Sequence, residues 1–268
     1  MAGTWTVDPA ILSNLREREA RRALVDERLD EALIEAEELL DENPDNPTGL
    51  EISGLAALQM GDVMMALQAL DRLVSLHSTD ARILQALAVA RFEAIEYRGA
   101  LNAAEQATMK DPTLAAGWFY QGLALERLGN ATAADERFRT AAEYDGEQFP
   151  VPERNADLAW DELLQAGLEK VPESIRDFFN GVPIVFEEYP AVEELIEHYP
   201  PISPFRDALY RGQAPVEADP WKTRPRQIML YTGNLSRPTP APNLIEDRIA
   251  DALMHEAMHW LGLSHLPG

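Results

Sequence analysis

Small residues recur every thirty-four positions through the first half of the chain. One series holds only alanine, and a second holds alanine or glycine: Ala32, Ala66, Ala100 and Ala134, then Ala20, Gly54, Ala88 and Gly122. Small side chains at a fixed spacing let two helices approach closely, and each helix pair must then cover its apolar face with the next pair. The spacing therefore predicts a solenoid of stacked helix pairs with a concave surface.

The last repeat is the most complete, with Trp118, Gly122, Ala134, Phe138 and Ala141 in order. This pattern resembles the tetratricopeptide repeat family, and the resemblance covers about residues 13–148 as four repeats. The first repeat is degenerate and highly charged, as expected of a solvent-facing cap. The resemblance implies a domain over residues 1–148 that binds a peptide or protein in its groove.

Three aromatic residues are placed by the repeat on first helices, which present the groove in such solenoids: Phe92, Phe119 and Tyr120. They either line a binding groove or pack between repeats, and the sequence leaves both interpretations open.

A zinc-hydrolase motif, H-E-x-x-H-x-x-G-x-x-H, runs from His255 to His265. Residues four apart lie on one face of a helix, so His255 and His259 can bind one ion. Gly262 can end the helix in the left-handed conformation and return His265 to the same ion. Three protein ligands with a fourth position open are typical of catalytic zinc, so the motif predicts a Zn²⁺ site.

Glu256 lies roughly 100° around the helix from His255, where it can border the ion without binding it. This position suits the general base of a zinc hydrolase. Asp251, one turn earlier, either orients an imidazole or is simply solvated. Asn243 followed by Glu246 predicts a capping box at the start of the helix.

The composition of the chain limits the classes of partner and the cellular location that can be expected. A net charge of −23 argues against binding nucleic acid or anionic lipid, because phosphate groups attract basic surfaces. The acidity otherwise indicates a solvated surface, a basic partner or life at high salt. There is no cysteine, and we expect no signal peptide and no membrane span, so a cytoplasmic protein is the expectation.

A second family resemblance covers about residues 155–268, which are similar to the minimal zincin family of bacterial metallopeptidase-like domains. Four blocks carry it besides the motif: Val171–Glu173, Val182–Val185, Leu209–Pro215, and Ile228–Tyr231 with Asn234–Leu235. The family often has aspartate at the third ligand position, where this chain has His265. The resemblance implies a small α+β domain that holds zinc.

The zincin resemblance also implies a rim strand that aligns an extended substrate, and the candidate is Gln227–Tyr231. Tyr210, Tyr231 and His198 are candidates for stabilising the oxyanion of peptide hydrolysis. For the tyrosines, the alternative is a buried ring with a satisfied hydroxyl.

The chain is therefore expected to be mainly α, with a tetratricopeptide-type solenoid at 1–148, a stiff linker at 149–154 and a zincin-like domain at 155–268. The expected function is zinc-dependent peptide hydrolysis, with the solenoid recruiting the substrate. The alternative is an interaction protein whose zincin domain binds zinc structurally or is inactive. Glu256 favours the enzyme, because a structural site has no need of a carboxylate beside its metal.

Overall fold

The computed structural model describes residues 9–76, 80–152, 158–212, 219–238 and 244–263. The chain forms two compact units, each with most of its contacts inside itself. The N-terminal unit consists of residues 1–151 with 198–201, and the C-terminal unit of residues 152–197 with 202–268. The linker predicted at 149–154 stays a prediction, because residues 153–157 lie outside the described ranges.

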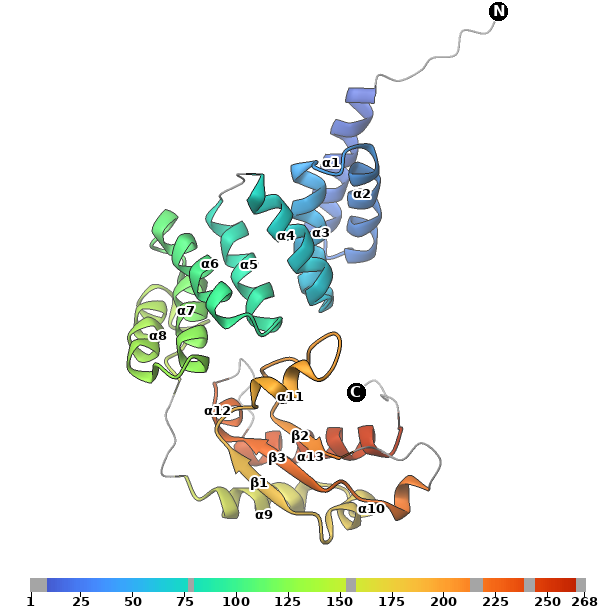
Figure 1. Cartoon of the computed structure of the whole chain (residues 1–268), viewed down its shortest axis with the longest axis vertical. Coiled ribbons are helices and arrows are strands. Elements are labelled where there is room, and N and C mark those ends of the chain that lie inside the picture. The colour runs from blue at the N-terminus through green and yellow to red at the C-terminus, as the bar shows by residue number, and fades with distance from the viewer. Residues whose placement is uncertain (1–8, 77–79, 153–157, 213–218, 239–243, 264–268) are drawn as a thin grey trace, which may run out of the picture. The chain divides into compact units, whose positions relative to one another are not determined.

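The described N-terminal unit consists of helices that pack in consecutive pairs (Figure 1). Their bounds are α1 Pro9–Val25, α2 Leu29–Glu42, α3 Pro47–Met60, α4 Val63–Ser75, α5 Ala81–Glu93, α6 Tyr97–Lys110, α7 Ala115–Arg127 and α8 Ala131–Asp145. This succession of helix pairs confirms the predicted α-solenoid.

The recurring small residues lie where the two helices of a pair touch. A Cβ atom added at Gly122 would lie 2.6 Å from the Phe138 ring, and one added at Gly54 would lie 2.7 Å from Leu70 Cγ. In the other two repeats, the equivalent positions are both buried alanines: Ala20 with Ala36, and Ala88 with Ala104. A glycine on the first helix thus makes room for a large side chain on the second.

The turn inside each helix pair also repeats. Its residue with positive φ is Glu27 (58°), Gly61 (78°), Ile95 (66°) or Gly129 (80°), and these residues are thirty-four apart. Glycine adopts this conformation without a steric penalty, whereas glutamate and isoleucine do not. Two of the four turns therefore carry local strain that the surrounding helix packing sustains.

The described C-terminal unit combines short helices with one sheet (Figure 1). Its elements are α9 Trp160–Lys170, α10 Glu173–Arg176, the 3₁₀ turn η1 Asp177–Phe179, β1 Ile184–Glu187, α11 Val192–Ile196, β2 Ala208–Arg211, the 3₁₀ turn η2 Pro220–Lys222, β3 Gln227–Tyr231, α12 Thr232–Leu235 and α13 Ile245–Trp260. A small α+β unit therefore follows the solenoid, as predicted.

The sheet has the order β1-β3-β2, with β1 parallel and β2 antiparallel to β3. The prediction that Gln227–Tyr231 is a rim strand is wrong, because β3 is hydrogen-bonded on both sides. Residues 228–231 are fully buried, as is typical of a central strand covered on both faces. The edge strands are β1 and β2.

The core of this unit lies between the sheet and α13, with α9 packed beside α13. Ile228 and Leu230 of β3 share one buried cluster with Ile249 and Leu253 of α13. At Gly167 of α9, an added Cβ atom would lie 2.7 Å from Ile249 Cγ2. This close approach fixes α13, the helix that carries the motif, on a rigid support.

Candidate metal centre

The motif helix α13 ends as its glycine predicts. Gly262 has a φ of 65°, and its N–H donates to the His259 carbonyl at 3.2 Å. The N–H of Leu263 reaches back to the Met258 carbonyl at 3.0 Å, which completes a Schellman cap. The cap confirms that Gly262 ends the motif helix in the left-handed conformation, while the path of the chain to His265 lies outside the described residues.

The start of α13 differs from the prediction. Leu244 occupies the N-cap position and offers no side-chain hydrogen bond. The predicted capping box is wrong, since the helix begins at Ile245, and Asn243 itself lies outside the described residues. Glu246 and Asp247 instead place two carboxylates in the first turn, where they stabilise the positive end of the helix dipole.

His255 and His259 lie one turn apart on α13, with ring centroids separated by 4.5 Å. At this separation the two imidazoles can bind the same ion. His265 lies outside the described residues. Within the described ranges no cluster of three histidine, cysteine or acidic residues could hold a metal ion.

Glu256 follows His255 in the sequence. Its side chain is buried, with only 4% of the residue's surface exposed. Its Oε2 accepts a hydrogen bond from the Tyr210 backbone N–H at 2.9 Å. Burial raises the pKa of Glu256 to about 7, although the Tyr210 hydrogen bond and the Arg206 charge act in the opposite direction. A carboxylate with a pKa near neutrality is suited to taking and returning protons.

Strand β2 presents its open edge to this carboxylate. The carbonyls of Asp207 and Arg211 accept from Tyr231 N–H and Arg226 N–H, at 2.9 and 2.8 Å. Because alternate residues of a strand direct their backbone groups to opposite sides, those of Tyr210 point away from β3. The edge strand beside the motif is therefore β2.

Arg206 is the site residue that the sequence analysis missed. Its guanidinium Nη1 contacts His255 Nε2, and its charge acts on the pKa of Glu256. No motif includes Arg206, and it is forty-nine residues from His255. Nothing in the sequence signals this contact.

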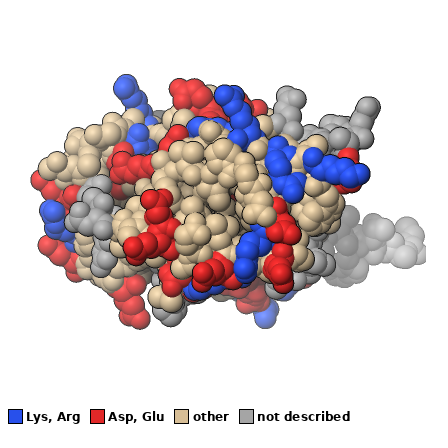
Figure 2. All heavy atoms as spheres, turned by 90° about the horizontal axis from the view of Figure 1, so that it is seen from below, with Lys and Arg blue, Asp and Glu red and all other residues tan. Residues whose placement is uncertain are grey.

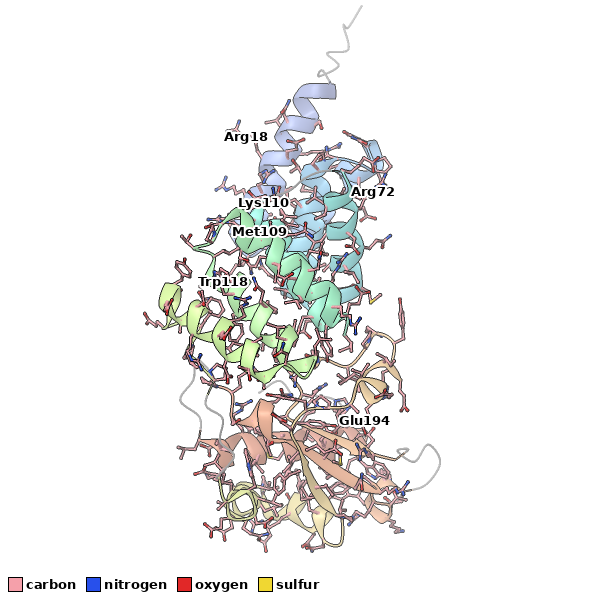
Figure 3. All side chains as sticks on the ribbon, turned by 60° about the vertical axis from the view of Figure 1, so that its left-hand side comes forward. Arg18, Arg72, Met109, Lys110, Trp118 and Glu194 are labelled. Carbon is pink, nitrogen blue, oxygen red and sulfur yellow. The ribbon has the colours of Figure 1, made fainter. Side chains whose placement is uncertain are left out.

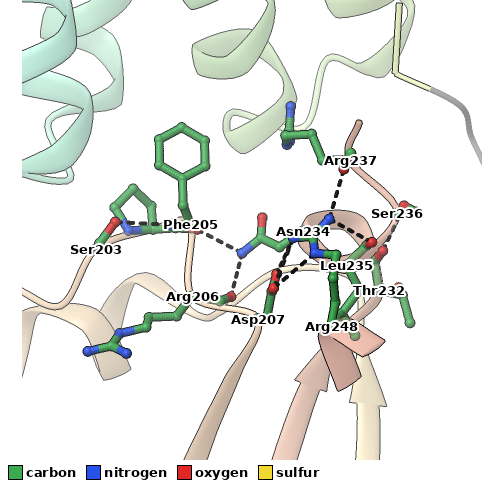
Figure 4. Close-up of polar contacts among 11 residues, drawn as sticks. Ser203, Phe205, Arg206, Asp207, Thr232, Asn234, Leu235, Ser236, Arg237 and Arg248 are labelled. Atoms are coloured by element: carbon green, nitrogen blue, oxygen red, sulfur yellow. Dashed lines mark hydrogen bonds and ion pairs between the residues drawn. The ribbon is translucent and has the colours of Figure 1, made fainter. Parts of the chain in front are cut away.

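The backbone around Arg206 is held by a polar network (Figure 4). The buried Asn234 side chain donates from Nδ2 to the carbonyls of Pro204 and Arg206, at 2.9 and 2.6 Å. Asp207 forms a bidentate ion pair with Arg248, at 2.8 and 2.9 Å. We call Asn234, Asp207 and Arg248 the polar clamp. Asn234 belongs to a block of the zincin resemblance, so the sequence identified this residue but not the contacts that it makes.

The three oxyanion candidates have different surroundings. Tyr231 is fully buried, and its hydroxyl contacts Glu194 Oε2 at 3.2 Å, so it has a structural role. The Tyr210 ring packs edge-on against Trp260 at 5.3 Å. Burial and, second, the charge of Glu256 raise the pKa of the Tyr210 hydroxyl, which keeps it protonated. The third candidate, His198, is assigned to the N-terminal unit, whereas the motif helix belongs to the C-terminal unit.

Asp251 is exposed, and the described residues provide it with no hydrogen bond or ion pair. It therefore orients neither His255 nor His259, which favours the alternative that the sequence left open, a solvated carboxylate.

The solenoid has a groove of about 660 Å³ between α5, α7 and the end of α8. Tyr120 lines it together with Arg82 of α5. Phe92 is fully buried and stacks on Tyr97 at 5.2 Å, so it packs the core. Phe119 packs against other aromatic rings at 5.1–6.0 Å: Tyr120, Phe138 and Phe149. Of the three predicted groove aromatics, Tyr120 lines this groove, and Phe92 and Phe119 do not.

A second aromatic feature lies on α7, where Trp118 Nε1 donates to the Pro112 carbonyl at 2.7 Å (Figure 3). The Arg137 guanidinium lies 5.4 Å from the Trp118 ring centroid. This contact joins α7 to α8 in the last repeat.

Acidic and basic side chains are interspersed on the face that Figure 2 shows. No helix in the described ranges is long and apolar enough to cross a membrane. Neither observation identifies a binding partner, which must come from the local chemistry of the site and the groove.

Comparisons with known proteins agree with the division into two units. A family model described as zincin-like metallopeptidase matches residues 179–266. No curated protein matches the chain.

Solved structures of MamA resemble the helical half. One, "Crystal structure of MamA protein", is 20% identical with a TM-score of 0.47, over 50% of this chain and 74% of that chain. Another, "Crystal structure of MamA", is 21% identical with a TM-score of 0.45, over 48% and 75%. Since these scores are below 0.5, the assignment of the solenoid depends on its own helix pairs and repeat spacing. The chain thus joins a tetratricopeptide-type solenoid to a unit that is similar to zincin-like metallopeptidases.

Proposed function

We propose that this protein is a zinc-dependent metallopeptidase whose solenoid recruits the substrate. The observation that carries the proposal is the grouping of one buried carboxylate with two adjacent imidazoles on α13. Glu256 has a pKa raised to about 7, and the rings of His255 and His259 are 4.5 Å apart. These donors fit zinc, which prefers imidazole nitrogen and leaves one position open in catalytic sites.

His255, His259 and His265 would hold the ion, and the Schellman cap at Gly262 ends the helix between the second ligand and the third. Zinc, when bound, supplies the Lewis acidity that makes water nucleophilic near neutral pH. Glu256 would accept the proton of the attacking water and deliver it to the leaving amine. The Tyr210 N–H holds the carboxylate in place for both transfers.

The substrate would lie along β2, the edge strand beside Glu256. An extended peptide can add to an open strand edge through backbone hydrogen bonds. In β2, the backbone groups of Ala208 and Tyr210 face away from β3, and Tyr210 N–H already contacts the base. A peptide on this edge would therefore be close to the proton acceptor.

The solenoid groove supports a recruiting role. It combines an aromatic ring, Tyr120, with a guanidinium, Arg82, and an exposed second ring, Tyr144. Aromatic and arginine side chains dominate the energetics of peptide recognition. The competing function, an interaction protein with a structural or inactive zinc site, uses the same groove but has no role for a buried Glu256.

The test is the zinc content of purified full-length protein and of His255→Ala, His259→Ala and His265→Ala. We expect one zinc per wild-type chain and a large loss of affinity in each variant. Unchanged zinc content in His265→Ala would remove that residue from the ligand set. Absence of zinc from the reconstituted wild-type protein would contradict the proposal as a whole.

A further inference from the structure

We propose that Arg206 competes with a metal ion for His255 Nε2 and so lowers the metal affinity of the proposed site. The inference rests on the proposed zinc site and adds a residue that controls its occupancy. Its basis is a single contact: Arg206 Nη1 lies in hydrogen-bonding contact with His255 Nε2.

An imidazole nitrogen has one lone pair, which can accept a hydrogen bond or bind a metal but not both. Nη1 of arginine only donates, so His255 Nε2 is the acceptor in this contact. Binding of a metal at that atom requires the guanidinium to leave. Arg206 and a bound metal ion would thus exclude each other at His255 Nε2.

The polar clamp explains how the exchange can take place without unfolding. The Arg206 carbonyl is fixed by Asn234 Nδ2 at 2.6 Å, and the next residue is fixed by the ion pair between Asp207 and Arg248. The Arg206 side chain points away from this network (Figure 4). Its backbone is therefore immobile while its long side chain can rotate, which is the requirement for a local exchange of cations.

The charge of Arg206 opposes metal binding, as does its hydrogen bond to His255. A guanidinium beside the site repels a divalent cation, because like charges at short range in a partly buried site are poorly screened. A carboxylate offsets this repulsion, and the Arg206 charge lowers the pKa of the buried Glu256, although burial raises it more. Removal of Arg206 should consequently favour metal binding.

The experiment measures the zinc dissociation constant of full-length protein by competition with a chromophoric chelator at fixed pH. Arg206→Gln removes the charge and the strong donor, and we expect its zinc affinity to rise at least about tenfold. The matched control is Arg224→Gln, which makes the same change of net charge at an exposed arginine over Phe178. Its affinity should stay within about twofold of wild type.

A second pair of variants separates the contact from a general charge effect. In a His255→Ala background, whose weakened affinity is measured at higher zinc concentration, the guanidinium has no nitrogen to compete for and only its charge remains, so the gain in zinc affinity from Arg206→Gln should be clearly smaller than in wild type. An equal gain in both backgrounds would contradict the competition. An unchanged or weaker zinc affinity in Arg206→Gln, with zinc binding still weakened in His255→Ala, would overturn this inference and leave the zinc site standing. Absence of zinc binding in both wild type and Arg206→Gln would overturn both.

Discussion

The solenoid and the C-terminal unit both end helices with residues of positive φ, but they hold those helices together differently. In the solenoid, buried small residues recur at one spacing, so the same contact is made several times. In the C-terminal unit, the loop before β2 is held by a few polar side chains, each making a contact found once. A repeated apolar interface distributes its stability, whereas the proposed metal site depends on single residues.

The largest effect is expected in the polar clamp. Arg248 pairs with Asp207 and also donates from Nη1 to the carbonyls of Leu235 and Arg237 at 2.8 Å. Arg248→Ala leaves the partly buried Asp207 without its partner and two carbonyls without their donor, and these losses together should cost about 3–5 kcal/mol. Hydrogen exchange resolved by segment should report this loss in β2 and α13 and not in α1–α8. Arg226→Ala, an exposed arginine of the same unit, is the control and should change stability by less than about 0.5 kcal/mol.

A similar effect should appear in the pH dependence of the metal-free C-terminal unit. Burial raises the pKa of Glu256 from 4.5 to about 7, so the folded state binds more protons than the unfolded state between these values. Stability should therefore fall as pH rises from about 4.5 to about 7, by about 3 kcal/mol in total. The measurement is the denaturant midpoint across this range with a chelator present. The Glu256→Gln variant should lack this pH-dependent loss of stability. Identical pH profiles for wild type and variant would show that folding does not raise the pKa of Glu256.

In the solenoid, the expected effects are smaller and coupled within pairs. Gly122→Ala places a methyl group 2.6 Å from the Phe138 ring and should cost about 1–3 kcal/mol through overpacking. In a Phe138→Leu background the same change should cost less, because the smaller side chain leaves room. Equal costs in both backgrounds, measured by thermal unfolding, would contradict the pairing of a glycine with a large residue.

The smallest effect should be a gain. Ile95 has a φ of 66° at the position where two other repeats have glycine. Ile95→Gly relieves steric strain and should stabilise the solenoid by roughly 1 kcal/mol, less any apolar contact it removes. Glu27→Gly is the matched variant, because its side chain is exposed and has no packing to lose. A loss of stability in Glu27→Gly would mean that these turns are not strained.

The sequence predicted the structural features that repeat along the chain and those that depend only on neighbouring residues. The spacing of the small residues identified the solenoid, and Gly262 identified the helix end, since each depends on nearby residues alone. It misplaced the rim strand, because a run such as Gln227–Tyr231 does not reveal how many neighbours a strand has. It missed Arg206, because a contact between residues forty-nine apart depends on the fold of the loop between them.

The same limit explains Asp251 and the groove aromatics. Helical spacing placed Asp251 one turn from His255, but only the structure shows that it remains in solvent. Phe92 and Tyr120 both fall on first helices, yet Phe92 is fully buried and Tyr120 lines the groove. Periodicity identifies the face of a helix but not which neighbours cover it.

The central claim is that Glu256 acts as a base and is not merely part of the packing around the metal. The measurement is peptide hydrolysis by zinc-loaded full-length protein and by Glu256→Gln, with zinc content determined on the same samples. We expect the variant to keep its zinc and to lose at least about 10²-fold in turnover, the lower end for removal of a positioned general base. Undiminished turnover in a zinc-loaded Glu256→Gln variant would contradict the account.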